Sequence, residues 1–163
     1  MGIRNWILVI IFFSLIGKSQ LLIINKKLAR IICIDYGGKR TGIAVTDPFK
    51  IIATALETIA TKDFIPYLKN YFAVETVELL LIGYPLNLDN SATHSTPLVK
   101  AVIKVLEKEF PNLPIKKVDE RYTSKMASMA MVEMGMKKKD RQKKENTDMI
   151  AATMMLQEYL NNL

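Results

Sequence analysis

Cysteine and histidine are nearly absent from this sequence, which has one of each among its 163 residues. With Cys33 alone, no disulfide can form within the chain, and this favours a cytoplasmic protein. Cys33 lies inside the apolar run "RIICID", so we expect it to be a small buried hydrophobe, and we expect His94 on an exposed loop. Internal repeats and Ser/Pro-rich linkers are also lacking. A chain of this length is therefore expected to form one domain.

Acidic residues are in the minority, and the formal net charge is +7. Such an excess favours an anionic partner such as nucleic acid. Four of the cations lie in the first 28 residues, which contain no acid, and they are Arg4, Lys18, Lys26 and Lys27. The remaining chain carries +3, so its global charge alone is weak evidence for a partner.

Residues 1–28 form an apolar leader that we treat apart from the fold. Trp6 to Gly17 reads "WILVIIFFSLIG", a run of 12 residues, which is too short to span a bilayer. No small-residue cleavage site follows it. Three interpretations stay open: a start site assigned too far upstream, a membrane tether, and an export signal. The folded domain is expected over residues 29–163.

Hydrophobic patterning predicts an α/β fold for this domain. Short β-rich or continuously apolar runs predict five strands, at 30–35, 41–47, 51–60, 77–85 and 114–120. Apolar residues at helical spacing predict four helices, at 62–72, 95–110, 123–135 and 147–163. Three strands followed by alternating helices and strands indicate a mixed five-stranded sheet with helices on both faces.

Acidic residues fall where these elements begin or end. Asp35 ends the first strand, Asp119 and Glu120 end the fifth, and Asp148 is expected in the first turn of the last helix. If the first and fifth strands are neighbours, these carboxylates converge at one edge of the sheet. A divalent cation would relieve their repulsion, so we expect Mg²⁺ or Mn²⁺ bound there.

Each acid also has a structural explanation. Asp35 could initiate a turn, Glu120 could pair with Arg121, and Asp148 could interact with the helix dipole. The small side chains of Ala151 and Ala152 argue against the explanation for Asp148, because they would let the helix bring this acid close to the sheet.

Glycines and cations surround the first acid. Gly37 and Gly38 allow backbone conformations with positive φ and leave room for a bulky ligand, with Lys39 and Arg40 reaching toward phosphate. Gly83 is expected in a stiff turn after the central strand.

A second group of cations lies between the last two helices. Residues 137–144 contain six Lys or Arg, including Lys143 and Lys144, and one Asp. We expect a mobile loop there, serving either as a solvated connection or as a clamp on phosphates together with Arg121.

Four blocks in this order resemble the YqgF or RuvX-like family of pre-16S rRNA nucleases, formerly described as Holliday junction resolvase-like. The blocks are "IDYGGKRTGIAVTD", "LLIGYPLNLDNS", "VDERYTS" and "NTDMIAATMMLQEYL". The resemblance implies a ribonuclease H-like fold, a cytoplasmic location and maturation of the 5′ end of 16S rRNA. It implies Asp35, Glu120 and Asp148 as the acidic set, with precursor rRNA and ribosomal particles as partners.

The resulting hypothesis is a metal-dependent endonuclease acting on structured RNA. The same acids could instead cut branched DNA. A nucleotide-binding module and a non-catalytic RNA-binding factor are alternatives of another class, and Asp119 could take the place of Glu120.

Overall fold

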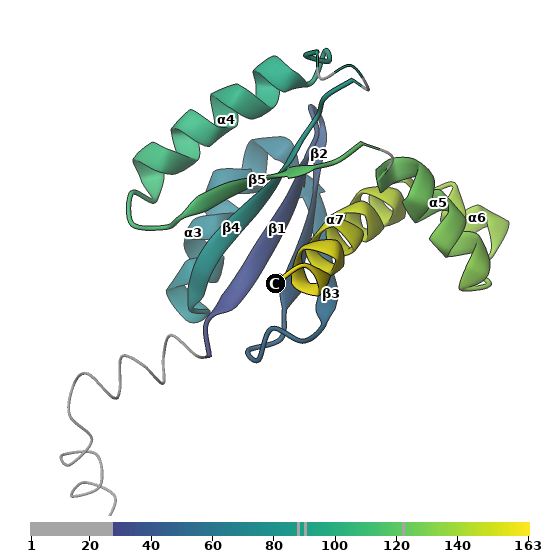
Figure 1. Ribbon diagram of the computed structural model, residues 1–163, viewed down its shortest axis with the longest axis horizontal. Coiled ribbons are helices and arrows are strands. Elements are labelled where there is room, and N and C mark those ends of the chain that lie inside the picture. The colour runs from purple at the N-terminus through teal and green to yellow at the C-terminus, as the bar shows by residue number, and fades with distance from the viewer. Residues whose placement is uncertain (1–27, 88, 90, 122) are drawn as a thin grey trace, which may run out of the picture.

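The computed structural model describes residues 28–87, 89, 91–121 and 123–163 (Figure 1). Its centre is a five-stranded sheet in the order β3-β2-β1-β4-β5. The three strands from β3 to β1 are antiparallel, whereas β4 and β5 run parallel to β1. This is the ribonuclease H-like arrangement, and the expected α/β class is confirmed. The strands are β1 (Arg30–Tyr36), β2 (Arg40–Thr46), β3 (Ala53–Ala60), β4 (Val77–Tyr84) and β5 (Ile115–Asp119).

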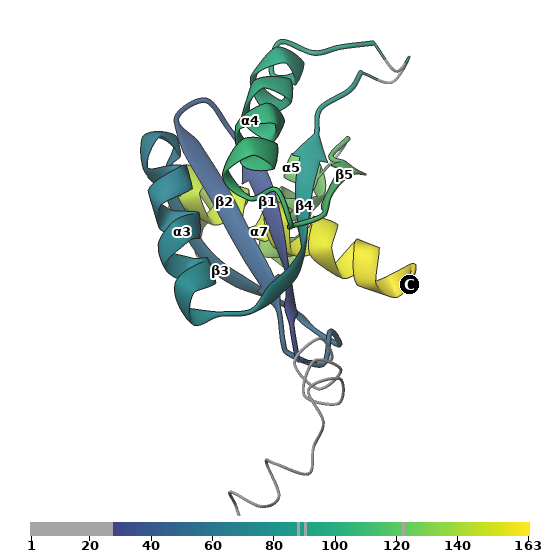
Figure 2. The same cartoon turned by 90° about the vertical axis from the view of Figure 1, so that its left-hand side faces the viewer.

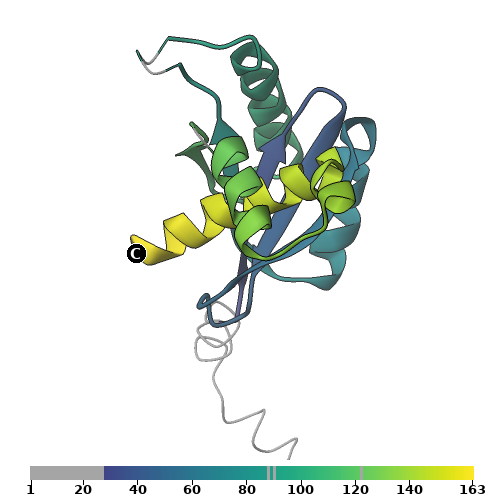
Figure 3. The same cartoon turned by 90° about the vertical axis from the view of Figure 1, so that its right-hand side faces the viewer.

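The helices cover both faces of this sheet. Helices α3 and α4 lie on one face, and α7 crosses the other face with α5 packed against it (Figures 2 and 3). In the part of the chain that is described, no helix is long and apolar enough to cross a membrane. The helical elements are η1 (Thr61–Asp63), α3 (Phe64–Val74), α4 (Thr96–Glu109), α5 (Thr123–Glu133), α6 (Lys138–Arg141) and α7 (Lys144–Asn161).

Strand β1 is buried on both sides because its apolar residues alternate between two cores. Ile32 and Ile34 pack with α3 and α4, whereas Ile31 and Cys33 pack against α7. Cys33 is fully buried, as expected. The side chain of Asp35 follows the alternation of Ile31 and Cys33, so it points toward the α7 face of the sheet.

The structure differs from the sequence-based interpretation of the elements at three points. Strands β1 and β5 are not neighbours, because β4 lies between them. Helix α7 begins at Lys144, which moves Asp148 out of its first turn. Gly37 and Gly38 do not have positive φ; among the described glycines, that conformation is found at Gly135, where α5 has ended.

The basic segment 137–144 was expected to be a mobile loop, and it contains α6 and the first residue of α7 instead. Local contacts of its polar groups explain the difference. The Nζ of Lys143 lies 2.8 Å from the Oδ1 of Asp140, and the Nε of Arg141 donates to the carbonyl oxygen of Met136. The amide of Asn146 donates to the carbonyl oxygen of Asp140. One acid and these backbone acceptors offset the repulsion among the lysines.

A close approach between β2 and α7 sets the position of the last helix. A Cβ atom added to Gly42 would lie 2.2 Å from the carbonyl oxygen of Asp148. The buried residues Ala151 and Ala152 give α7 a small surface there, as expected from the sequence. The absence of a side chain at Gly42 therefore allows α7 to lie directly on the sheet.

We expect Gly42→Ala to lower the free energy of unfolding by about 2 kcal/mol or more, since the new methyl group must displace helix backbone. Urea denaturation measures this loss. Gly38→Ala is the matched control, because its Cβ would meet only Leu98 Cδ2, at 3.9 Å. Equal stability of the two variants would contradict the close contact.

Candidate active site

Asp35 lies between two glycines on the neighbouring strands. It pairs directly with Gly42 on β2. On the other side Ile34 pairs with Ile82, which brings Gly83 of β4 next to Asp35. Neither neighbour has a side chain that would compete for the space over the sheet. We call Asp35 and the acids that share this space, Glu120 and Asp148, the acidic site.

Glu120 reaches the acidic site across β4. A Cβ atom on Gly83 would lie 2.4 Å from the Oε2 of Glu120, so the carboxylate occupies the space that any other residue at position 83 would fill. Gly83 is an interior residue of β4, not part of a turn as expected. A glycine inside a strand is a known mark of close approach, although the sequence alone does not show that Glu120 is the residue that approaches Gly83.

Two of the three carboxyl groups have a strongly raised pKa. Burial, and then the negative charge of Asp148, raises the pKa of Asp35 to about 7. Burial also raises the pKa of Glu120 to about 7, with further contributions from the charges of Asp35 and Asp119. Asp35 thus interacts electrostatically with both other acids, as expected of carboxylates that share one site.

A cavity of about 140 Å³ opens beside Asp35 and Asp148. Arg40 is part of its wall, and its Nε lies 3.1 Å from Oδ2 of Asp148 and 3.8 Å from Oε1 of Glu145. The rest of the lining comes from Gly37, Gly38 and Lys39. Negative and positive groups therefore meet at the same opening, which suits a phosphate held next to carboxylates.

The acidic site fits a divalent cation in ligand type, because carboxylate oxygens are the ligands that Mg²⁺ prefers. Across the residues that the structure describes, however, no three His, Cys, Asp or Glu side chains are arranged to hold one metal ion. The positive group next to Asp148 is Arg40, which would have to release Asp148 for joint coordination. Metal binding by the three acids stays a prediction.

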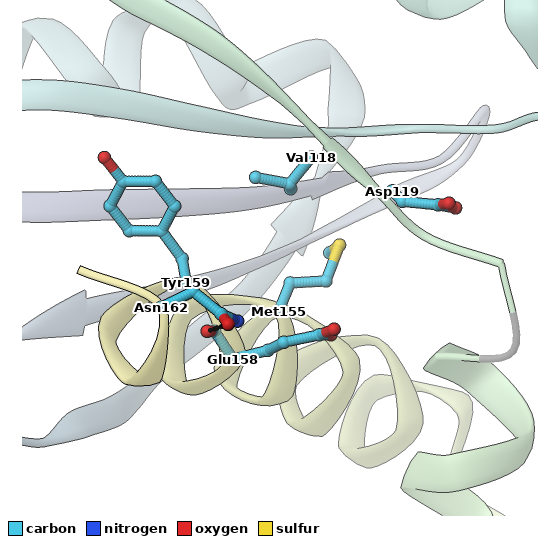
Figure 4. Close-up of a pocket in the computed structure, with 6 residues that line it drawn as sticks. All are labelled: Val118, Asp119, Met155, Glu158, Tyr159 and Asn162. Carbon is cyan, nitrogen blue, oxygen red and sulfur yellow. Dashed lines mark hydrogen bonds between the residues drawn. The ribbon is translucent and has the colours of Figure 1, made fainter.

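Asp119 takes a different position from Glu120. It forms an ion pair with Arg121, whose Nε lies 2.7 Å from Oδ2, and this contact lowers the pKa of Asp119. Figure 4 shows Asp119 beside a separate pocket of about 170 Å³, lined also by Glu158 and Tyr159 of α7. The geometry favours Glu120 over Asp119 as the partner of Asp35.

The cations expected to bind nucleic acid are divided among three places. Lys39 and Arg40 lie at the cavity. Lys143 and Lys144 lie at the start of α7, about one turn before Asp148, and Lys143 pairs with Asp140. Arg121 is held by Asp119 at the end of β5.

We expect stability to depend on pH through the acidic site. Carboxyl groups whose pKa is raised to about 7 bind more protons in the folded state than in the unfolded state between about pH 4 and pH 7. Their stabilising contribution is full below that window and is lost as pH rises through 7. Asp35→Asn removes one of these groups. The free energy of unfolding of the variant, relative to that of the wild type, should therefore rise by on the order of 2 kcal/mol between pH 5 and pH 8.

Urea denaturation in EDTA at several pH values measures this gain. Glu107→Gln, on the exposed side of α4, serves as the control and should follow the wild type. A constant difference between Asp35→Asn and wild type across the range would contradict the raised pKa values.

Comparison with known proteins adds an independent line of evidence. The RuvX family, described as Holliday junction resolvase, matches residues 29–162. A Flavobacterium psychrophilum protein named "Putative pre-16S rRNA nuclease" is 48% identical over 131 residues, covering 80% of this chain and 96% of that protein. A Bacteroides thetaiotaomicron protein of the same name is 44% identical, covering 83% of this chain and 98% of its own.

Among solved structures, Thermus thermophilus RuvC in complex with a Holliday junction matches with a TM-score of 0.48 and 14% identity, covering 82% of this chain and 94% of RuvC. The sequence matches extend over nearly the whole described domain. By these matches the chain belongs to the RuvX family.

Proposed function

We propose that this protein is a metal-dependent endonuclease that processes the 5′ end of precursor 16S rRNA in the cytoplasm, on ribosomal particles or their precursors. The observation that supports the proposal is that Asp35 of β1 interacts electrostatically with Asp148 of α7 and with Glu120 at the end of β5. The names of the relatives support a nuclease acting on precursor rRNA.

The three acids would hold the metal, and Mg²⁺ or Mn²⁺ would stabilise charge on the phosphate oxygens and lower the pKa of a bound water. The other tasks fall to the chain itself. Arg40 and Lys39 at the cavity are placed to bind the phosphate. Because burial raises the pKa of Glu120 and Asp35 to about 7 when no metal is bound, a divalent cation would have to displace protons from them near neutral pH.

Branched DNA is the second candidate substrate, because the family that matches is described as Holliday junction resolvase. The acidic site itself does not discriminate between the two, since the same phosphodiester chemistry applies to both. Discrimination must come from surfaces around the cavity, such as Lys143 and Lys144 at the start of α7.

The proposal is tested by cleavage of two substrates in Mn²⁺, a precursor 16S rRNA fragment and a four-way DNA junction. We expect the wild type to cut the RNA at its 5′ side, and we expect Asp35→Asn and Glu120→Gln each to reduce the rate by at least about 100-fold. Glu107→Gln controls for loss of a carboxylate elsewhere and should cut normally. Cleavage by Asp35→Asn at the wild-type rate would overturn the proposal, and cleavage of the junction alone would assign the DNA substrate.

Replacing Arg40 should separate metal binding from nucleic-acid binding. In Arg40→Gln, Asp148 loses the cation that contacts it, so we expect Mn²⁺ to bind up to about tenfold more tightly. Nucleic acid should bind more weakly, with a salt dependence reduced by about one charge. Calorimetric titration with Mn²⁺ and salt-dependent RNA binding measure the two effects.

Lys104→Gln, on the exposed side of α4, is the control for loss of a positive charge. Unchanged Mn²⁺ affinity in Arg40→Gln would show that Arg40 and the metal do not compete for Asp148.

A further inference from the structure

Five large apolar side chains are exposed at the end of the sheet opposite the acidic site. We call them the apolar pole. They are Leu28 at 45% exposure, Phe49 at 66%, Ile51 at 67%, Ile52 at 60% and Val74 at 84%.

Contacts of Arg30, the first residue of β1, bring these residues together. Its backbone amide donates to the carbonyl oxygen of Thr76, just after the end of α3, and its Nη1 donates to the carbonyl oxygen of Thr46, at the end of β2. Leu28, the end of α3 and the turn between β2 and β3 therefore lie side by side. Figure 1 shows the start of β1, the end of α3 and the turn between β2 and β3 at the lower end of the coloured ribbon.

The turn that carries three of the apolar side chains has a fixed conformation. The carboxylate of Asp47 accepts hydrogen bonds from the amides of Phe49, Ile51 and Ile52, at 3.0, 2.7 and 2.8 Å. Lys50 has a φ of 59° and forms an ion pair with Glu78 of β4. This turn holds apolar side chains out in water, a costly arrangement unless another apolar phase covers them.

The leader enters the domain at this pole, since residue 27 is followed directly by Leu28. Its largely apolar run of 12 residues, Trp6 to Gly17, is too short to cross a bilayer and could contribute to binding at a membrane surface. The leader carries four cations and no acid, as suits an anionic lipid surface. The two cations of the pole itself, Arg30 and Lys50, are already paired with Glu75 and Glu78.

From these observations we propose that the apolar pole, which the cationic leader directly precedes in the sequence, docks on the surface of an anionic lipid bilayer. The position of the acidic site agrees with this orientation. Asp35 lies five residues along β1 from Arg30, roughly 17 Å, and the cavity opens at the far edge of the sheet. A protein docked by the pole keeps its cavity open to the aqueous phase. The inference does not depend on the nuclease activity, and neither does its test.

The test uses the full chain with vesicles of phosphatidylglycerol and phosphatidylcholine. Trp6 is the only tryptophan, so its emission reports the leader alone. We expect the emission to shift to shorter wavelength and the protein to sediment with anionic vesicles. Binding to vesicles of phosphatidylcholine alone should be weaker by at least about tenfold.

A triple variant, Phe49→Ser with Ile51→Ser and Ile52→Ser, tests the pole. We expect it to bind anionic vesicles at least about tenfold more weakly than the wild type. The matched control changes the three exposed apolar residues of α5, Met126, Met129 and Val132, to serine, and it should bind like the wild type. Circular dichroism establishes that both variants are folded.

A second readout places the turn in the lipid without removing its apolar residues. Cys33 is buried, so Phe49→Cys can be labelled selectively with an environment-sensitive dye, whose emission should shift on addition of anionic vesicles. Three results would overturn the proposal: no shift of either probe, equal binding by the two triple variants, and equal binding to neutral vesicles. Trp6 emission that is already shifted without lipid and reverts in the Phe49 triple variant would also overturn it, because the leader itself would then cover the pole.

Discussion

The arrangement of this protein depends on how three carboxylates are allowed to approach one another. Asp35 is surrounded by strands that offer it no side chain, because Gly42 and Gly83 are its neighbours on either side. Each glycine leaves space that another part of the acidic site fills: the backbone of α7 over one and the carboxylate of Glu120 over the other. The same close packing removes water from the acids, and this raises the pKa of two of them.

Sheet, helix and charge are coupled through this contact. Helix α7 lies on the sheet because its surface is small at Ala151 and Ala152, and in that position it presents Asp148 to Arg40. The repulsion among the acids is therefore partly offset from within the chain by one guanidinium. A stable fold and a reactive site make opposite demands here, since the groups that would hold a metal destabilise the fold when they are charged and metal-free.

The fold could be predicted from the sequence largely because its signals are local. Short β-rich runs identified β1 and β2, the apolar run identified β4, and the ends of the first and fifth strands pointed to Asp35 and Glu120. What failed was non-local: the position of β4 between β1 and β5, and the role of Gly83, which depends on a residue 37 positions later in the chain. The segment 137–144 was misjudged because its charge was counted without the contacts of Asp140 that offset it.

Residues that form the acidic site lie far apart in the sequence, and this determines when the site can form during translation. Arg40 and Asp148 are 108 positions apart, and the strand that supplies Asp35 is made long before α7. A nascent chain can form the sheet early, but it has no complete set of acids until α7 has emerged and folded onto β2. If the protein cuts ribosomal RNA, the order of translation alone keeps each new copy inactive toward the ribosome that is producing it.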